Sequence, residues 1–179
     1  MVYIILAEGF EEIEAIAPCD ILRRGNVETK LCGVGSDEVS GGHGIKVKTD
    51  CTVEETDFSD AEMIVFPGGT LGVENIGKCE KAMAAMKKAC SDGRRTAAIC
   101  AGPTLLAKLK ITDGRKAVCY PGLESEMGGA VICRQAGAVT DGNVTTGKAA
   151  GTSIQFALEL LRVLRGEEAA ETVKKSIHF

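Results

Sequence analysis

The stretch TAAICAGPTLLAK, residues 96–108, joins a short apolar run to a leucine-rich segment through a single cysteine. The apolar run at 96–99 predicts a buried strand, and residues 102–109 predict a helix. Pro103 fits the first turn of that helix, because proline is favoured there. Cys100 therefore stands at a sharp turn from strand to helix, where it either packs in the core or acts as a nucleophile.

Strand-like and helix-like segments alternate along the rest of the chain. Apolar runs predict strands, and apolar residues spaced three and four apart predict helices. The expected strands are 2–7, 27–34, 62–66, 96–99, 116–119, 131–136 and 144–146, and the expected helices are 11–24, 79–90, 102–109, 153–164 and 167–175. Residues 37–50 are glycine-rich and predict a hairpin or excursion at a sheet edge. This order predicts an α/β fold: a three-layer sandwich around a mostly parallel sheet.

Three of the predicted strands lead directly into residues with chemical uses. The first strand is followed by EGFEEIE, which ends at Glu14, and strand 62–66 is followed by Pro67, Gly68 and Gly69. Strand 96–99 is followed by Cys100. Because sites in parallel sheets form beyond the carboxyl ends of the strands, we expect these three segments to share one pocket.

Each segment suits a step of covalent catalysis. The free amides at a helix N-terminus favour an anion, which predicts a lowered pKa and a reactive thiolate for Cys100. The backbone amides of Gly68, Gly69 and Ala101 can hold an oxyanion, and Glu14 can exchange a proton beside the sulfur. Taken singly, each feature has a plainer explanation as core packing, a turn or a solvated carboxylate.

Composition excludes several other classes of protein. The chain has 179 residues and a formal net charge of −4, which gives nucleic-acid binding no electrostatic support. No apolar run is long enough for a membrane span, and the N-terminus lacks the features of a signal peptide. The eight cysteines show no CxxC spacing, and there are only two histidines. We therefore expect a cytoplasmic protein with free thiols and no metal site, with the cysteines other than Cys100 used for packing.

The motifs LAEGFEEIEAIAPCDILRR, IVFPGGTLGVENI, TAAICAGPTLLA and GTSIQFALELL together resemble the ThiJ/PfpI superfamily, in the branch of the parkinsonism-associated protein deglycase, or glyoxalase III. The resemblance covers almost the whole chain and implies a single domain over 1–179 with a flavodoxin-like fold, a homodimer and no cofactor. It makes Cys100 the nucleophile of a strained elbow and Glu14 its hydrogen-bonding carboxyl group. It also assigns Gly68, Gly69 and Ala101 to the oxyanion.

The chain departs from this family pattern at several positions. Tyr120 stands where several relatives have a histidine near the cysteine, and Ala149 and Ala150 stand where relatives can have Gly-Pro at the pocket. His43 lies in a stretch that resembles the dimer-contact hairpin, so it either enters the partner's pocket or lies on a plain surface turn. Ala101, rather than histidine, follows the cysteine, and His178 is followed only by Phe179. A cysteine peptidase or amidase with a Cys-His triad is therefore not supported.

Two functions remain from this reasoning. In the first, the Cys100 thiolate converts small 2-oxoaldehydes such as methylglyoxal to lactate, as a glyoxalase or deglycase-like enzyme. In the second, the protein is an oxidative-stress sensor or chaperone-like protein that acts through oxidation of Cys100 with little turnover. Nucleotide binding at PGGTLG is not supported, because no Gly-Lys-Ser/Thr follows it.

Overall fold

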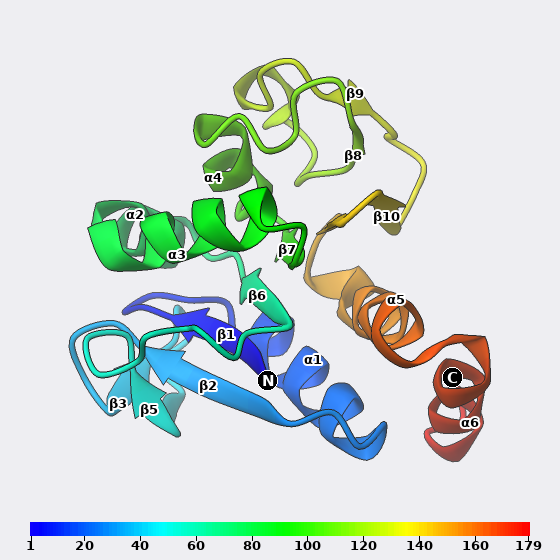
Figure 1. Cartoon of the computed structure of the whole chain (residues 1–179), viewed down its shortest axis with the longest axis horizontal. Coiled ribbons are helices and arrows are strands. Elements are labelled where there is room, and N and C mark those ends of the chain that lie inside the picture. Colours follow the sequence, from blue (N-terminus) through cyan, green and yellow to red (C-terminus); the bar gives the residue numbers. More distant parts are fainter.

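The computed structural model describes residues 1–179 and is built around one seven-stranded sheet (Figure 1). The strand order is β10-β11-β7-β6-β1-β2-β5, and every neighbouring pair is parallel except β10 with β11. The strands of this sheet are β1 (Val2–Leu6), β2 (Thr29–Gly33), β5 (Cys51–Thr52), β6 (Met63–Phe66), β7 (Arg95–Ile99), β10 (Ala138–Asp141) and β11 (Val144–Gly147). The predicted mostly parallel sheet is confirmed.

Helices cover both faces of this sheet. They are α1 (Glu12–Arg24), α2 (Thr70–Lys78), α3 (Glu80–Ser91), α4 (Pro103–Lys108), α5 (Ser153–Arg165) and α6 (Glu167–Ser176). Alternate residues of a strand face opposite sides of a sheet. Accordingly, Ile4 packs in one apolar core with α1, α5 and α6, whereas Ile5 packs in a second core with α2, α3 and α4. The predicted three-layer sandwich is therefore confirmed. None of these helices combines the length and the apolar character needed to cross a membrane.

The excursion predicted at 37–50 is an antiparallel hairpin of β3 (Glu38–Ser40) and β4 (Lys46–Lys48). It forms a small sheet of its own, joined to the start of α1 by hydrogen bonds such as that from the Gly42 amide to the Phe10 carbonyl, 2.8 Å. The hairpin therefore stands beside the carboxyl ends of the central strands, where it can border a site.

Several predicted elements differ from those in the structure. The strands expected at 116–119 and 131–136 are only β8 (Lys116–Ala117) and β9 (Val131–Ile132), paired outside the main sheet. Residues 133–136 form a turn, and β10 follows it. Helix α2 and the edge strand β5 were not predicted. Two glycines lower the helix propensity of α2, and its buried Val73 and Ile76 hold it on the sheet instead.

Candidate active site

The carboxyl ends of β1, β6 and β7 meet at one edge of the sheet. Val2 pairs with Met63, and Met63 pairs with Arg95, so the three strands run in parallel and in register. Their exits carry Glu14, the Gly68-Gly69 pair and Cys100 to the same place. The predicted convergence of these three segments is confirmed.

Cys100 occupies a backbone conformation that residues with side chains rarely adopt. Its φ is +65°, which costs of order 1–3 kcal/mol for a residue other than glycine. Two hydrogen bonds fix this conformation: the Cys100 amide donates to the Gly147 carbonyl at 3.0 Å, and the Tyr120 amide donates to the Cys100 carbonyl at 2.8 Å. The arrangement is a strand-to-helix elbow, which presents the half-buried side chain at the head of the turn.

Glu14 lies on the first turns of α1, and its side chain is fully buried. The Gly68 amide donates to its Oε2 atom at 2.8 Å. Its Oε1 atom has no hydrogen-bond partner in the structure, and the neighbouring Cys100 thiol interacts with the carboxyl group and affects its pKa. A buried carboxyl group in such surroundings favours its neutral form.

Glycine is required at position 68 because the carboxyl and the sulfur crowd its α-carbon. A Cβ there would lie 2.7 Å from the Cys100 Cβ and 3.0 Å from its Sγ, and it would overlap Glu14 Oε2. Gly69 has a φ of +88°, and a Cβ there would lie 2.7 Å from the Glu11 nitrogen and would overlap the Gly9 carbonyl. The glycine pair therefore lets backbone amides lie directly beside the cysteine and the carboxyl.

The electrostatics of Glu14 and Cys100 are linked. Burial raises the pKa of Glu14 from 4.5 to about 7, against hydrogen bonds from Cys100 and Gly68 that lower it. The pKa of Cys100 is raised to about 12. Burial is the largest cause, and the charge of Glu14 and its hydrogen bonding with the thiol also raise this pKa. Hydrogen bonds from the Ala101 and Gly69 amides oppose this rise. The predicted lowering of the Cys100 pKa is wrong, because burial of the sulfur, and after it the charge that Glu14 carries when ionised, outweigh the two amides.

Protonation of Glu14 reverses its effect on the sulfur. A neutral carboxyl group has no charge to repel a thiolate and donates a hydrogen bond to it. Cys100 and Glu14 therefore form a pair that can hold a shared proton, with the proton on sulfur or on oxygen. This makes the site suited to proton transfer near neutral pH.

A cavity of about 680 Å³ opens onto Cys100 and Ala101. Gly69, Tyr120 and His43 also line it, whereas Glu14 and Gly68 do not. Ala149 and Ala150 also lie outside its lining, at the start of the short 3-10 helix η2 (Ala150–Thr152). Further lining residues come from the loop after β1, the start of α2, the hairpin and the loop after β8: Gly9, Phe10, Glu11, Gly42, Thr70, Leu71 and Leu123. The cavity can take a small molecule with an apolar part.

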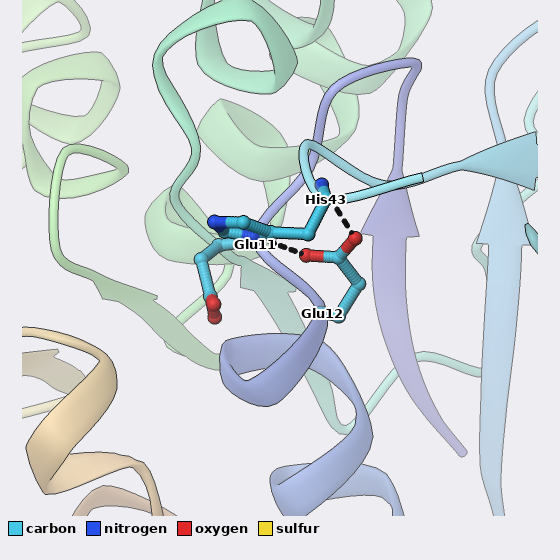
Figure 2. Close-up of side chains that lie close together, drawn as sticks. All are labelled: Glu11, Glu12 and His43. Carbon is cyan, nitrogen blue, oxygen red and sulfur yellow. Dashed lines mark hydrogen bonds and ion pairs between the residues drawn. The ribbon is translucent and has the colours of Figure 1, made fainter. Parts of the chain in front are cut away.

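His43 is held at the cavity by Glu12 (Figure 2). Its backbone amide and its Nδ1 atom each lie 2.8 Å from an oxygen of the Glu12 carboxylate. Glu12 is buried, which would raise its pKa, but the hydrogen bonds from His43 outweigh burial and lower it. The same contact raises the pKa of His43. The pair pins the hairpin to α1 and places an exposed imidazole at the cavity of its own chain.

Glu11, Glu12 and His43 have ligand atoms within 4.8 Å of one another, and imidazole and carboxylate are metal-ligand types. Both oxygens of Glu12 already accept hydrogen bonds from His43, and a carboxylate oxygen of Glu11 accepts one from the Glu14 amide at 2.8 Å. The N-terminus of α1, with its positive potential, also disfavours a cation here. The cluster is therefore best understood as an anchor for the hairpin and a cap for the helix.

Comparison with known proteins places this geometry in a family. The sequence profile of the DJ-1/PfpI family matches residues 1–163. The chain belongs to the DJ-1/PfpI family. The family and the fold implied by the sequence resemblance are thereby confirmed.

Individual relatives are about one-third identical to this chain. The Parkinson disease protein 7 homolog of Danio rerio is 33% identical over 96% of this chain and 93% of its own length. A protein named deglycase from Pyrococcus abyssi is 31% identical over 92% of this chain and 99% of its own. Protein DJ-1 homolog A of Arabidopsis thaliana is 35% identical over 96% of this chain, which spans only 45% of that longer protein.

Solved structures agree with the fold throughout. Oxidized DJ-1 of Toxoplasma gondii has a TM-score of 0.95 at 27% identity, over 99% of this chain and 97% of its own. A cysteine-to-alanine mutant of a DJ-1 superfamily protein from Salmonella typhimurium has a TM-score of 0.94 at 29% identity, again over 99% and 97%.

Sequence reasoning missed the residues that support the cavity rather than react in it. Thr70 and Leu71 begin α2, which was not predicted, and the contact of Glu12 with His43 joins segments far apart in the chain. The EGFEEIE run alone indicated supporting residues, because acidic residues at the start of a helix can cap it as well as take part in catalysis.

The raised pKa of Glu14 makes stability depend on pH. The folded state binds this proton more tightly than the unfolded state, so the stabilisation is present below about pH 4.5 and is lost as pH rises through about 7. We expect Glu14→Gln to gain stability relative to wild type over this range, by about 3 kcal/mol at pH 8. Urea unfolding at pH 5 and pH 8 measures this difference.

Glu74→Gln, which removes one exposed carboxylate from α2, is the matched control for the loss of charge. If Glu14→Gln and wild type keep the same difference in stability at both pH values, Glu14 does not have a raised pKa in the folded protein.

Proposed function

We propose that the chain is a cofactor-independent enzyme of the glyoxalase or deglycase type that acts on small 2-oxoaldehydes such as methylglyoxal and gives lactate. The observation that carries this proposal is the Cys100–Glu14 pair: a nucleophile on a strained elbow, in contact with a buried carboxyl group whose pKa is raised to about 7. Relatives named deglycase, from Pyrococcus abyssi and Pyrococcus horikoshii, support an enzyme of this family type.

The first step of the proposed reaction adds the thiol to the aldehyde. Glu14 accepts the Cys100 proton, and the sulfur attacks the aldehyde carbon. The carbonyl π electrons move to oxygen, and the Gly69 and Ala101 amides, which lie beside the Cys100 sulfur, are the donors that would stabilise it. Proton return from Glu14 gives a hemithioacetal.

The second step moves hydrogen between neighbouring carbons. Glu14 takes the proton from the former aldehyde carbon and delivers it to the ketone oxygen, which gives an enediol. Glu14 then takes the proton of the hydroxyl on the sulfur-bearing carbon and delivers it to the former ketone carbon, so that this hydroxyl becomes the carbonyl of a lactoyl thioester on Cys100. Water then hydrolyses this thioester, releasing lactate and restoring the thiol. One carboxyl group serves every proton transfer because its pKa lies near neutrality.

The cavity suits such a substrate in size and character. Leu71 and Leu123 offer apolar surface for a methyl group, and Tyr120 and His43 offer polar atoms at the rim. Eight free cysteines fit a reducing compartment, so we place this activity in the cytoplasm.

We expect Cys100→Ala to abolish lactate formation from methylglyoxal in the absence of glutathione. Glu14→Gln, which cannot exchange a proton, should reduce kcat by about 10²–10⁴-fold. Cys133→Ala, at a half-buried cysteine outside the cavity, is the matched control and should keep full activity. Enzymatic lactate determination measures all four proteins. Equal turnover in Cys100→Ala and wild type would remove the cysteine from the reaction.

A second candidate function rests on the same pair. A half-buried thiol beside a carboxyl group that can donate a hydrogen bond also suits an oxidative-stress sensor or chaperone-like protein, because a protonated Glu14 can stabilise a Cys100 sulfinate.

For this second function, mild peroxide should add two oxygen atoms at Cys100 before any other cysteine becomes a sulfinate, and Glu14→Gln should slow the reaction. Peptide mass spectrometry over a peroxide titration locates the first site. Earlier formation of a sulfinate at another cysteine would exclude this sensor mechanism.

We further propose that the enzyme is a homodimer. Ile13 and Ile16 on α1 are 55% and 40% exposed, and Ile45, next to β4, is 57% exposed. These isoleucines belong to two segments that the Glu12–His43 contact holds together, so they give an apolar surface next to the active-site cavity.

Ile13→Glu should therefore convert the dimer to a monomer in light scattering coupled to gel filtration. Ile154→Glu, at an exposed isoleucine on α5, is the matched control and should leave the dimer intact. A wild-type mass equal to one chain would contradict the proposal.

A further inference from the structure

Two cysteines outside the active site lie directly opposite each other on neighbouring strands. Cys32 of β2 pairs with Cys51 of β5 in the parallel register of the sheet. Neighbouring strands lie about 4.8 Å apart, and a disulfide requires Cα atoms about 4.4–6.8 Å apart. The backbone therefore already holds these two residues within the span of a disulfide.

Both side chains point to the same face of the sheet. Cys32 belongs to the apolar core beneath α2 and α3, and Cys51 packs against that core from the sheet edge. Burial raises the pKa of Cys32. The charge of Cys51 and its hydrogen bonding with Cys32 also raise this pKa. The two residues are therefore neighbours through their sulfur atoms as well as through their backbones.

Hydrogen bonds on both sides of the pair fix its register. The Asp50 amide donates to the Leu31 carbonyl and the Leu31 amide to the Asp50 carboxylate, each at 2.8 Å. Beyond the pair, the Val53 amide donates to the Gly33 carbonyl at 2.8 Å. A bond between the two sulfurs would therefore form within this fixed register.

We propose that Cys32 and Cys51 are a dithiol site that forms a reversible disulfide when the protein meets peroxide. Cys51 is half-buried and meets the oxidant first, whereas Cys32 is fully buried. The Cys51 sulfur attacks one peroxide oxygen, giving a sulfenic acid and releasing water. The Cys32 sulfur then attacks the Cys51 sulfur, and the hydroxyl leaves with the Cys32 proton as a second water.

This disulfide would close the base of the segment that borders the active site. Residues 33–50 lie between the two cysteines and contain the β3–β4 hairpin, whose Gly42 and His43 line the cavity next to Cys100. Oxidation at the sheet edge would thereby tie down one wall of that cavity without changing Cys100 itself.

The sequence provides a direct test by mass spectrometry. Trypsin cleaves after Lys30, Lys46, Lys48 and Lys78, so Cys32 and Cys51 fall in separate peptides, 31–46 and 49–78, each with a single cysteine. The folded full-length protein is treated with hydrogen peroxide, free thiols are blocked with iodoacetamide, and the digest is analysed without reductant. We expect the crosslinked 31–46/49–78 peptide as the main disulfide, lost after dithiothreitol.

Thermal unfolding supplies a second readout. Closing this loop should raise the Tm of the oxidised protein by about 5 °C over the reduced protein. Cys51→Ser should lose both the crosslink and the shift, whereas Cys133→Ser, at another half-buried cysteine, should keep both. Separate alkylated peptides after peroxide, or sulfinate on Cys51 with Cys32 unlinked, would overturn the proposal. Other disulfide-linked cysteine pairs in amounts equal to the Cys32–Cys51 pair would also overturn the proposal.

Discussion

The active site depends on one buried hydrogen bond, from the Gly68 amide to Glu14 Oε2 at 2.8 Å. It joins α1 to the turn after β6, two segments that are far apart in the chain. The same contact brings the carboxyl against Cys100, because the space at the Gly68 α-carbon is shared by Glu14 and the cysteine side chain. Burial of the carboxyl group at this position raises its pKa to near neutrality, so the same contact positions Glu14 and sets its protonation.

The parallel sheet makes this contact possible, and that part could be predicted from the sequence. Continuous apolar runs such as VYIIL and MIVF indicate strands buried on both faces, and strands of this kind bring their exits to one edge. Glu14, Gly68 and Cys100 could therefore be assigned to one site from their positions after three strands. Short elements such as β5 could not, because two residues carry no periodic signal.

Neither the burial of individual side chains nor the contacts between distant side chains could be predicted from the sequence. The helix start after Cys100 predicts a stabilised thiolate, but burial of the sulfur, and after it the charge of Glu14, raise its pKa instead, and burial is a property of the whole fold. Likewise, Cys32 and Cys51 lack any recognisable spacing motif, and only the register of β2 with β5 sets them opposite each other. The hydrogen bond between Glu12 and His43 is likewise a tertiary contact between segments that are far apart in the chain.

Glu14 should titrate near neutral pH and share its proton with Cys100. The most direct measurement is a pH titration of the Glu14 carboxyl by NMR, with the side-chain carbon labelled and the signal assigned through Glu14→Gln. We expect a midpoint of about 7, moved upward in Cys100→Ala, because the hydrogen bond from Cys100 lowers the Glu14 pKa. A midpoint near the ordinary value of 4.5, unchanged by Cys100→Ala, would contradict this expectation.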